Sequence, residues 1–366
     1  MSTRQMIIWW KSCCTELLSS RYGMHCNYRL STVRALQQQF LILLVAVVII
    51  CFLLQLQTWP LLTEVHHPPQ AVKPRLFVTC ECGYERRLGN TMFSFAAAIG
   101  IARFNNLTVV IDRASYLVDT FRILEPLSVN MDNTMAYRSV EYHEYGRRGS
   151  AYDRGTRNLF RVIGSQPNHV RLRGYFQSWR YFDNVADRVR QNFVFHKQIS
   201  TVAELYLSSV EPAEWTKIDT GFIRVGIHIR RGDITDDPRF RDFGYTVATR
   251  DYFQSAMQYF AERYLHVQFV VCSDNVKWCR NNLPTAADIG SNVNIVFSEN
   301  RSPAVDLAIL AHCNHTIISV GSFGWWAAWL ANGTTIYYAD WPRPFSMLEY
   351  HVNKDDYFPK HWIPMR

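Results

Sequence analysis

A basic loop at residues 228–233, with the sequence HIRRGD, is the clearest chemical feature of this chain. It lies at the end of an apolar, β-branched run, 223–229, which predicts a buried strand. A guanidinium keeps its charge and binds oxygen atoms bidentately, so an arginine at a strand end suits a phosphate group. We expect Arg230 to face such a ligand, and Arg231 to turn back and pair with Asp233. A solvated charge cluster is the alternative, which the position at a strand end disfavours.

The tetrapeptide GSFG at residues 321–324 is a second candidate phosphate contact. It separates a predicted strand from a predicted helix, with Ser322 as the helix cap. The first backbone amides of a helix are free and bind anions without a charged side chain. The basic loop and residues Ser322, Phe323 and Gly324 could therefore hold one diphosphate from two sides. The helix that follows is apolar on nearly every side, so its tryptophans fit a buried core better than a ligand site.

Two further acids lie at the ends of predicted elements. The sequence CSDN at residues 272–275 ends another predicted strand. Asp274 could contact a ligand there, or Ser273 or Asp274 could cap the next helix, and the sequence leaves both open. Asp306 lies in the first turn of a predicted helix, where an acid complements the helix dipole.

From residue 75 onward, short apolar runs alternate with helical stretches. A strand at 76–80, a helix at 92–103 and a strand at 108–111 form one βαβ unit, which favours a parallel sheet. The C-terminal half repeats the pattern, with predicted strands at 223–229, 267–272, 293–297, 316–320 and 335–338, and predicted helices at 251–264, 276–283, from Pro303 after a Ser302 cap, and 323–330. We expect two α/β regions, 75–215 and 216–366, with a ligand between them at carboxyl strand ends.

A long apolar run precedes these elements. Residues 40–54 carry no charged side chain, and with residues 55–59 the run reaches about twenty residues, enough to cross a bilayer. Residues 1–39 hold five Lys or Arg and one Glu, a net charge of +4, so the positive-inside rule puts them in the cytosol. We predict a cytosolic tail at 1–39, a signal-anchor at 40–59, a stem at 60–74 and a body in the lumen. A cleaved signal peptide is the alternative, but no small-residue cleavage site follows.

Charge and motif content exclude several functions. The formal net charge of +8 suits an anionic small ligand or a membrane surface, but not the dense basic stripe of a nucleic-acid binder. The chain has no D-x-D triplet, no zinc-type spacing of Cys or His, and no glycine motif for a nucleotide, so we expect no metal or other cofactor. Five cysteines follow residue 74, an odd number that cannot all pair within one chain. Four sequons, at Asn106, Asn300, Asn314 and Asn332, permit N-glycosylation.

Five sequence blocks together resemble one known family. VGIHIRRGD, FVVCSDNVKWC and DLAILAHCNHTIISVGSFGWWAAWL are similar, in order and spacing, to three signature blocks of the α-1,2-fucosyltransferases. Two earlier pieces also match: residues 87–90 with the following Met-Phe, and residues 174–178 with the following Tyr-Phe. The resemblance covers roughly residues 75–339. Five blocks in order are far more specific than any one of them.

This resemblance implies a GT-B-like α/β fold with two Rossmann-like subdomains, in a single-pass type II protein of the Golgi membrane. The implied donor is GDP-β-L-fucose, and the implied reaction is inverting transfer to the 2-hydroxyl of a galactose-terminated glycan. By the same resemblance, Arg230 binds the β-phosphate, His228 lies beside it at the nucleotide, and residues 322–324 complete the cradle. Asp306 reads the guanine edge, and Asn90 lies across the cleft, near donor or acceptor.

Two positions depart from the family pattern, and some roles stay open. Arg86 stands where the family has a glycine, and Thr91 stands where it has a glutamine, in a loop that we expect on the acceptor side. The general base is open among the acids near the basic loop, which are Asp233, Asp236 and Asp237. A fucosyltransferase for another acceptor, such as a protein hydroxyl, and an inactive membrane lectin are the alternatives.

Overall fold

A computed structural model describes residues 76–128, 139–144, 149–165, 167–216, 222–299 and 301–366. By its internal contacts the chain divides into Met1–Val72 and Lys73–Arg366, and every described residue belongs to the second unit. The predicted tail, signal-anchor and stem, residues 1–74, therefore lie outside the described residues. Among the residues that are described, no helix combines the length and the apolar character that crossing a membrane requires.

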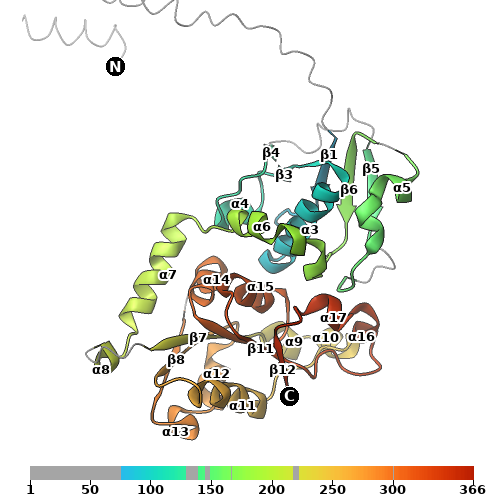
Figure 1. The fold of residues 1–366 in the computed structure, drawn as a ribbon. Coiled ribbons are helices and arrows are strands. Elements are labelled where there is room, and N and C mark those ends of the chain that lie inside the picture. The colour runs from blue at the N-terminus through green and yellow to red at the C-terminus, as the bar shows by residue number, and fades with distance from the viewer. Residues whose placement is uncertain (1–75, 129–138, 145–148, 166, 217–221, 300) are drawn as a thin grey trace, which may run out of the picture. The chain divides into compact units, whose positions relative to one another are not determined.

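The first part of the described chain forms a parallel four-stranded sheet in the order β2-β1-β6-β5 (Figure 1). Its strands are β1 (Phe77–Cys80), β2 (Thr108–Val109), β5 (Ser139–His143) and β6 (His169–Arg173). Helix α3 (Leu88–Asn105) joins β1 to β2, which confirms the predicted βαβ unit. The helix begins four residues before its predicted start. Gly89 and Asn90 are poor helix formers, and their contacts with the C-terminal half outweigh that propensity.

The second part forms a parallel six-stranded sheet in the order β12-β11-β10-β7-β8-β9. Its strands are β7 (Ile223–Ile229), β8 (Val267–Ser273), β9 (Val293–Phe297), β10 (His315–Ile318), β11 (Thr335–Tyr338) and β12 (Ile363–Met365). The predicted bounds are confirmed for β7, β9 and β11. Strand β10 ends two residues before its predicted end, and the hydroxyl of the next residue, Ser319, contacts the basic loop. The parallel α/β class is therefore confirmed.

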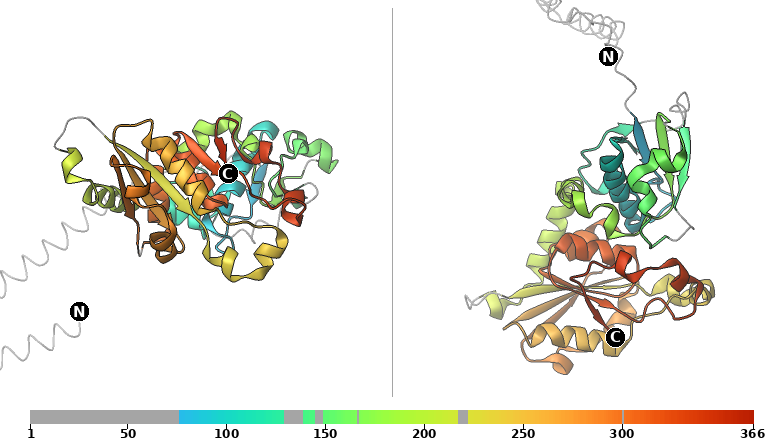
Figure 2. Two further views of the ribbon diagram at one scale, coloured as in Figure 1. Left: turned by 90° about the horizontal axis from the view of Figure 1, so that it is seen from below. Right: turned by 45° about the vertical axis from the view of Figure 1, so that its right-hand side comes forward.

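Helices cover both faces of the second sheet. Figures 1 and 2 show α14 (Pro303–Ala311) and α15 (Ser322–Ala331) on one face, and α11 (Arg250–Ala261) and α12 (Val276–Asn282) on the other. Ser302 caps α14 as predicted, since its hydroxyl accepts from the amide of Val305. Helix α7 (Lys197–Ser209) packs against α14.

Shorter elements complete the described residues. They are β3 (Ile111–Asp112), α4 (Tyr116–Thr120), β4 (Leu127–Ser128), η3 (Arg154–Asn158), α5 (Leu159–Ile163), η4 (Trp179–Tyr181), η5 (Asp183–Val185), α6 (Ala186–Asn192), α8 (Ala213–Thr216), α9 (Gly232–Asp236), α10 (Pro238–Phe243), α13 (Ala286–Ile289), α16 (Met347–His351) and α17 (Lys354–Tyr357). The short α9 matters most for function, because it shapes the basic loop.

An aromatic cluster joins α3 to α15. Trp325 and Trp326 of α15 are fully buried, which confirms that these residues pack in the core. The Phe93 ring of α3 lies 4.5 Å from the Trp325 ring and 5.0 Å from the Trp326 ring, between centroids. Phe182 stacks on Trp326 at 5.4 Å. Burial of these large rings, about 2 to 3 kcal/mol for each side chain, ties the two sheets together through their facing helices.

Candidate functional site

Three loops meet at the carboxyl ends of β7, β8 and β10. Strand β7 pairs with β10 on one side and β8 on the other, so the residues after β7 lie between the loops that follow β10 and β8. The amide of Arg230 donates to the Ser319 hydroxyl at 2.9 Å. The amides of Arg231 and Gly232 donate to the Asp274 carboxylate at 2.8 and 3.1 Å. The basic loop is thus held from both sides at the sheet edge where parallel α/β proteins bind ligands.

Asp274 therefore holds the basic loop, and it does not cap the next helix. Asn275 caps α12, because its side chain accepts from the amide of Trp278 at 3.0 Å. The sequence suggested a ligand contact or a helix cap for Asp274, and neither includes its bonds to the basic loop. A hydrogen bond between loops of different strands leaves no local sequence pattern. Ser319 is a second residue that sequence reasoning did not find, for the same reason.

Arg230 is held by an acid on its own loop. Its Nε donates to Asp233 Oδ1 at 3.1 Å, and its Nη2 donates to Oδ2 at 2.7 Å. The guanidinium also lies 5.7 Å from the ring centroids of Phe240 and Tyr245. Nη1 is left beside Gly321, where an added Cβ would lie 2.8 Å from it. Asp233 therefore fixes one edge of the Arg230 guanidinium, and Nη1 faces the start of α15.

The predicted pairing of Asp233 with Arg231 is wrong. Helix α9 begins at Gly232, and the helical turn brings Asp233 to the same side of the chain as Arg230, three positions before it. Asp233 Oδ2 also accepts from Arg87 Nη1 at 2.7 Å, so it bridges two arginines from distant parts of the sequence. Arg231 instead stacks over Trp278, with its guanidinium carbon 3.8 Å from the ring centroid.

The ion pairs of Asp233 make its carboxylate a weak base. Burial alone would raise the pKa of Asp233, but the hydrogen bonds from Arg230 and Arg87 outweigh it and lower the pKa to about 2. Asp237 caps α10 and pairs with Arg239, whose hydrogen bonds lower the pKa of Asp237. These contacts give both residues structural roles, and the lowered pKa makes each carboxylate a weaker base.

Two helix N-termini face each other beside Arg230. A Cβ on Gly89, in the first turn of α3, would lie 2.7 Å from the amide nitrogen of Phe323 in α15. Asn90 Oδ1 accepts from the Ser322 hydroxyl at 2.6 Å and from Gln177 Nε2 at 2.9 Å. The first amides of both helices lack intrahelical partners, and each helix dipole is positive at this end. With the guanidiniums of Arg230 and Arg87 close by, this arrangement suits a multiply charged anion.

Ser322 does not cap α15 as predicted. Gly321 is the N-cap, and its φ of +95° lies in the region that favours glycine. Ser322 is the first helical residue, and its hydroxyl is directed at Asn90 instead. Sequence patterns favour Ser over Gly at a cap, but the sharp turn out of β10 requires a positive φ here.

His228 is a buried, neutral side chain under this site. Burial, and then the charge of Arg230, lower its pKa to about 3. Its ring lies 5.1 Å from the Phe323 ring, and a Cβ added to Gly324 would overlap its Nδ1. Within the described residues, Nδ1 has no hydrogen-bond partner. His228 therefore supplies a polar atom but no charge.

Asp306 lies in a separate cluster under the ends of β8 and β9. Its Oδ1 accepts from the Ser298 hydroxyl at 2.6 Å, and burial raises its pKa. The Arg301 guanidinium lies 4.1 Å from the Tyr206 ring, and the Arg301 Nε and the Tyr206 hydroxyl are buried without a partner among the described residues. No described hydrogen bond or ion pair joins Asp306 to the basic loop.

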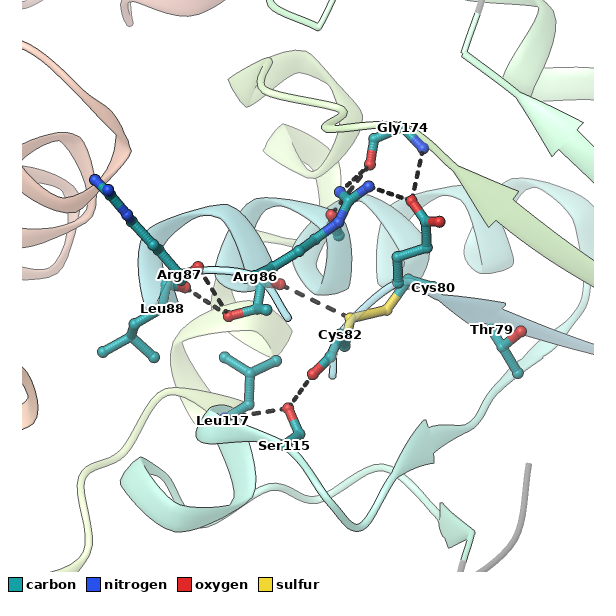
Figure 3. The surroundings of a disulfide bond; sticks show 12 residues. Thr79, Cys80, Cys82, Arg86, Arg87, Leu88, Ser115, Leu117 and Gly174 are labelled. Carbon is teal, nitrogen blue, oxygen red and sulfur yellow. Dashed lines mark hydrogen bonds and ion pairs between the residues drawn. A yellow bond between two sulfur atoms is a disulfide. The ribbon is translucent and has the colours of Figure 1, made fainter. Parts of the chain in front are cut away.

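A disulfide shapes the loop that leads into α3. Cys80 and Cys82 are bonded, as Figure 3 shows. Glu81 between them pairs with Arg86 and with Arg173. Arg86 Nη1 donates to the carbonyl of Gly174 at 2.6 Å, whereas Arg87 extends the opposite way in Figure 3.

These contacts give the two departures from the family pattern a structural account. Arg86 ties its loop to the end of β6, and the buried Thr91 hydroxyl donates to the carbonyl of Leu88 at 2.7 Å. The three other described cysteines are buried and free: Cys272, Cys279 and Cys313.

Three of the four predicted sequons lie among the described residues. Asn106, Asn314 and Asn332 are exposed, and Asn300 lies outside the described residues. The side-chain oxygens of Asn314 and Asn332 accept hydrogen bonds from Arg224 and Arg190, which leaves the nitrogen that would carry a glycan. Within the described ranges, no three His, Cys, Asp or Glu side chains are grouped to hold a metal ion.

Glu144 is a buried acid that we expect to make stability depend on pH. Burial raises its pKa to about 8 from 4.5, and its Oε1 has no partner among the described residues. Folding then takes up a proton between these two pH values, so stability falls as pH rises through this window, by up to ~1.4 kcal/mol per pH unit. In Glu144→Gln, thermal unfolding should show a flatter dependence from pH 5 to about 8. An unchanged slope would contradict this assignment.

Comparisons with known proteins agree with the geometry. Glycosyl transferase family 11 matches residues 45–366. The galactoside alpha-(1,2)-fucosyltransferase 1 of Bos taurus is 30% identical over 76% of this chain and 73% of its own length, and that of Sus scrofa is 31% identical over 76% and 72%. The galactoside alpha-(1,2)-fucosyltransferase 2 of Hylobates lar is 33% identical over 71% of each chain.

A solved structure is also similar, at a lower level. The structure of a mutant of Arabidopsis thaliana FUT1 in complex with GDP has a TM-score of 0.47, with 14% identity over 72% of this chain and 70% of that one.

Proposed function

Because this chain belongs to glycosyl transferase family 11, we propose that it transfers L-fucose from GDP-β-L-fucose to the 2-hydroxyl of a galactose in a glycan, with inversion. The observation that carries the proposal is the meeting of Arg230 with the N-termini of α3 and α15 at the carboxyl ends of parallel strands. The named function of the relatives supports the sugar, the acceptor and the α-1,2 linkage. The electropositive site supports a donor that ends in a diphosphate.

In the proposed mechanism, the bond from fucose C1 to the diphosphate oxygen breaks as the galactose 2-oxygen attacks C1. The transition state resembles an oxocarbenium ion, and negative charge grows on the departing GDP. Arg230 Nη1 and the first amides of α15 would meet that charge, already oriented by Asp233 and Gly321. The galactose 2-hydroxyl gives up its proton to a base that we do not assign, because Asp233 and Asp237 are both bonded to arginines.

We further propose the arrangement that the family resemblance implied. The fold is GT-B-like, with residues 216–366 on the donor side and residues 75–215 on the acceptor side. Asp306 would read the guanine, and the buried imidazole of His228 would hydrogen-bond the nucleotide. The hydrogen bonds of Asn90 to Ser322 and Gln177 support a place for Asn90 between the two sides.

We also propose that the protein is a single-pass type II protein of the Golgi membrane, anchored by residues 40–59 with its catalytic body in the lumen. The charge difference across this segment supports the orientation. Protease digestion of sealed microsomes tests it. Protection of residues 75–366 is the expected result, and digestion of this part would overturn the orientation.

The reaction is tested with the full-length chain in detergent, labelled GDP-fucose and a panel of acceptors. We expect transfer to free β-galactosides and a product cleaved by an α-1,2-specific fucosidase. Transfer only to folded protein domains would favour protein O-fucosylation. A chain that binds galactosides but neither binds GDP nor transfers fucose would favour the lectin alternative.

Chelation tests how the charge of the leaving diphosphate is stabilised. We expect full activity in excess EDTA, because arginine and helix amides can stabilise that charge without a metal ion. Initial rates with and without EDTA, with Mn²⁺ or Mg²⁺ added back, measure this. Loss of activity that either ion restores would refute a metal-free mechanism.

Asp274→Asn tests the hold on the basic loop. An asparagine keeps one acceptor but turns an amide group toward a backbone N–H, so at least one charge-assisted hydrogen bond is lost. We expect kcat/KM for GDP-fucose to fall about tenfold, which is the lower end of what such a bond contributes. Asp288→Asn is the matched control, since Asp288 also accepts a backbone amide, at the start of α13. Equal effects of the two variants would contradict the role of Asp274.

A further inference from the structure

A cavity lies far from the proposed diphosphate site. Its volume is about 460 Å³, within the range of ligand sites in proteins. Helix α3 begins at the proposed site, and Phe104 near its other end lines the cavity, about 24 Å away along the helix axis. The cavity therefore has no part in holding the proposed donor diphosphate.

The lining combines aromatic rings with cations. The lining residues are Phe104, Tyr152, Trp179, Arg154, Arg157, Arg180, Lys360, Asp183 and Asn184. The lining therefore includes four cationic side chains and one acidic side chain. A second cavity of about 140 Å³ shares Trp179, Asp183 and Lys360 with the first, and Trp329 adds another ring there.

Two of the four cations already have structural partners. Arg180 pairs with Asp356 at 3.0 Å, and the Arg157 Nε donates to the Tyr152 hydroxyl at 2.7 Å. Arg154 and Lys360 are exposed and, within the described part of the chain, make no ion pair or side-chain hydrogen bond.

These two cations are not needed to cap nearby helices. The last carbonyls of α15 are bonded by Arg190, and α3 ends at Asn106 in a left-handed cap. Arg154 and Lys360 are therefore free to bind an anion brought by a ligand.

We propose that this cavity is an accessory site for an acidic sugar residue, one that carries a carboxylate or a sulfate on an oligosaccharide. Flat aromatic faces pack against the apolar face of a sugar ring, while guanidinium and ammonium groups hold its anionic substituent. Neither a flat membrane headgroup surface nor a free phosphate ion would make use of the aromatic side chains that line this open cavity. This site goes beyond the proposed function, since it needs neither the donor nor transfer.

The test measures binding of 3′-sialyllactose and of lactose to the full-length protein in detergent micelles, with saturating GDP, by titration calorimetry. We expect 3′-sialyllactose to bind at least tenfold more tightly than lactose, and this preference to shrink in 0.5 M salt, because ionic contacts at exposed sites are screened. Inorganic sulfate is the third probe, and it should compete only weakly. Equal affinities for 3′-sialyllactose and lactose would overturn the proposal. Sulfate binding as tight as that of 3′-sialyllactose would overturn it as well.

The matched variants locate the site. Arg154→Ala with Lys360→Ala should bind 3′-sialyllactose roughly tenfold more weakly, since each partly exposed charge contributes about threefold. Arg161→Ala with Lys197→Ala removes the same two residue types from exposed positions outside the cavity and should bind like wild type. GDP affinity should be unchanged in both, which shows that each is folded. If the first variant loses GDP binding, the single Arg154→Ala answers the same question. Unaltered binding of 3′-sialyllactose by the cavity variant would refute this site.

Discussion

Arg230→Lys is expected to lower turnover by about 10²–10³ while the protein stays folded, the usual cost of losing one preorganised donor to a developing charge. Arg230 uses Nε and Nη2 to bond Asp233, and Nη1 faces the start of α15. A lysine offers one ammonium group, so it can pair with Asp233 or reach the ligand but cannot do both in this geometry. The pair with Asp233 keeps the loop charge-balanced, and we therefore expect a small change in unfolding temperature.

Steady-state rates and circular dichroism of Arg230→Lys measure this prediction. Arg231→Lys is the control, because Arg231 has the same charge one residue later but stacks on Trp278. We expect it to lose less than about tenfold, since a lysine retains the charge and part of the stacking. Turnover near the wild-type level in Arg230→Lys, or similar losses in both variants, would show that Arg230 is not the residue that meets the leaving group.

Gly89→Ala is expected to remove most activity through a contact between two helix starts. The added Cβ would lie 2.7 Å from the amide nitrogen of Phe323 and 2.8 Å from the carbonyl carbon of Ser322. Backbone atoms cannot rotate away as a side chain does, so α3 and α15 must separate. Overpacking of this kind typically costs about 1–3 kcal/mol. The displaced amides would no longer face the diphosphate, so we expect at least a hundredfold loss of kcat/KM.

Gly149→Ala is the matched control for this variant. Its added Cβ would meet only side-chain carbons of Tyr175, the nearest at 3.2 Å, and that ring can shift. Initial rates and thermal unfolding of both variants make the comparison. We expect Gly89→Ala to lower the unfolding temperature by several degrees and Gly149→Ala by less. Wild-type activity and stability in Gly89→Ala would contradict the close approach of the two helices.

Elements with a strong local signal were predictable from sequence. The apolar, β-branched runs of β7, β9 and β11 are confirmed to the residue. Proline after serine placed the start of α14 correctly. By contrast, the start of α3 was set four residues too late, because Gly89 and Asn90 are helical only through their contacts with α15. Local propensity decides an element only where no distant contact outweighs it.

In the candidate site, the positions of the key residues along the chain were predictable, whereas their contacts were not. The sequence alone placed Arg230, Asp274 and the start of α15 shortly after strands, because hydrophobic patterning is a local property. The charge pairings were not predictable. Asp233 pairs with Arg230 and with Arg87, which is 146 residues away, and Asp274 holds the amides of a loop on the neighbouring strand.

By itself, the sequence determined the parallel α/β class, the loops that carry the charged residues and the family to which they belong. Only the tertiary structure decided that Asp233 orients Arg230, that Ser322 bonds Asn90 and that the starts of α3 and α15 face each other. The physical reason is range. Backbone patterning acts over a few residues, whereas ion pairs and helix contacts join groups that only the folded chain brings within a few ångströms.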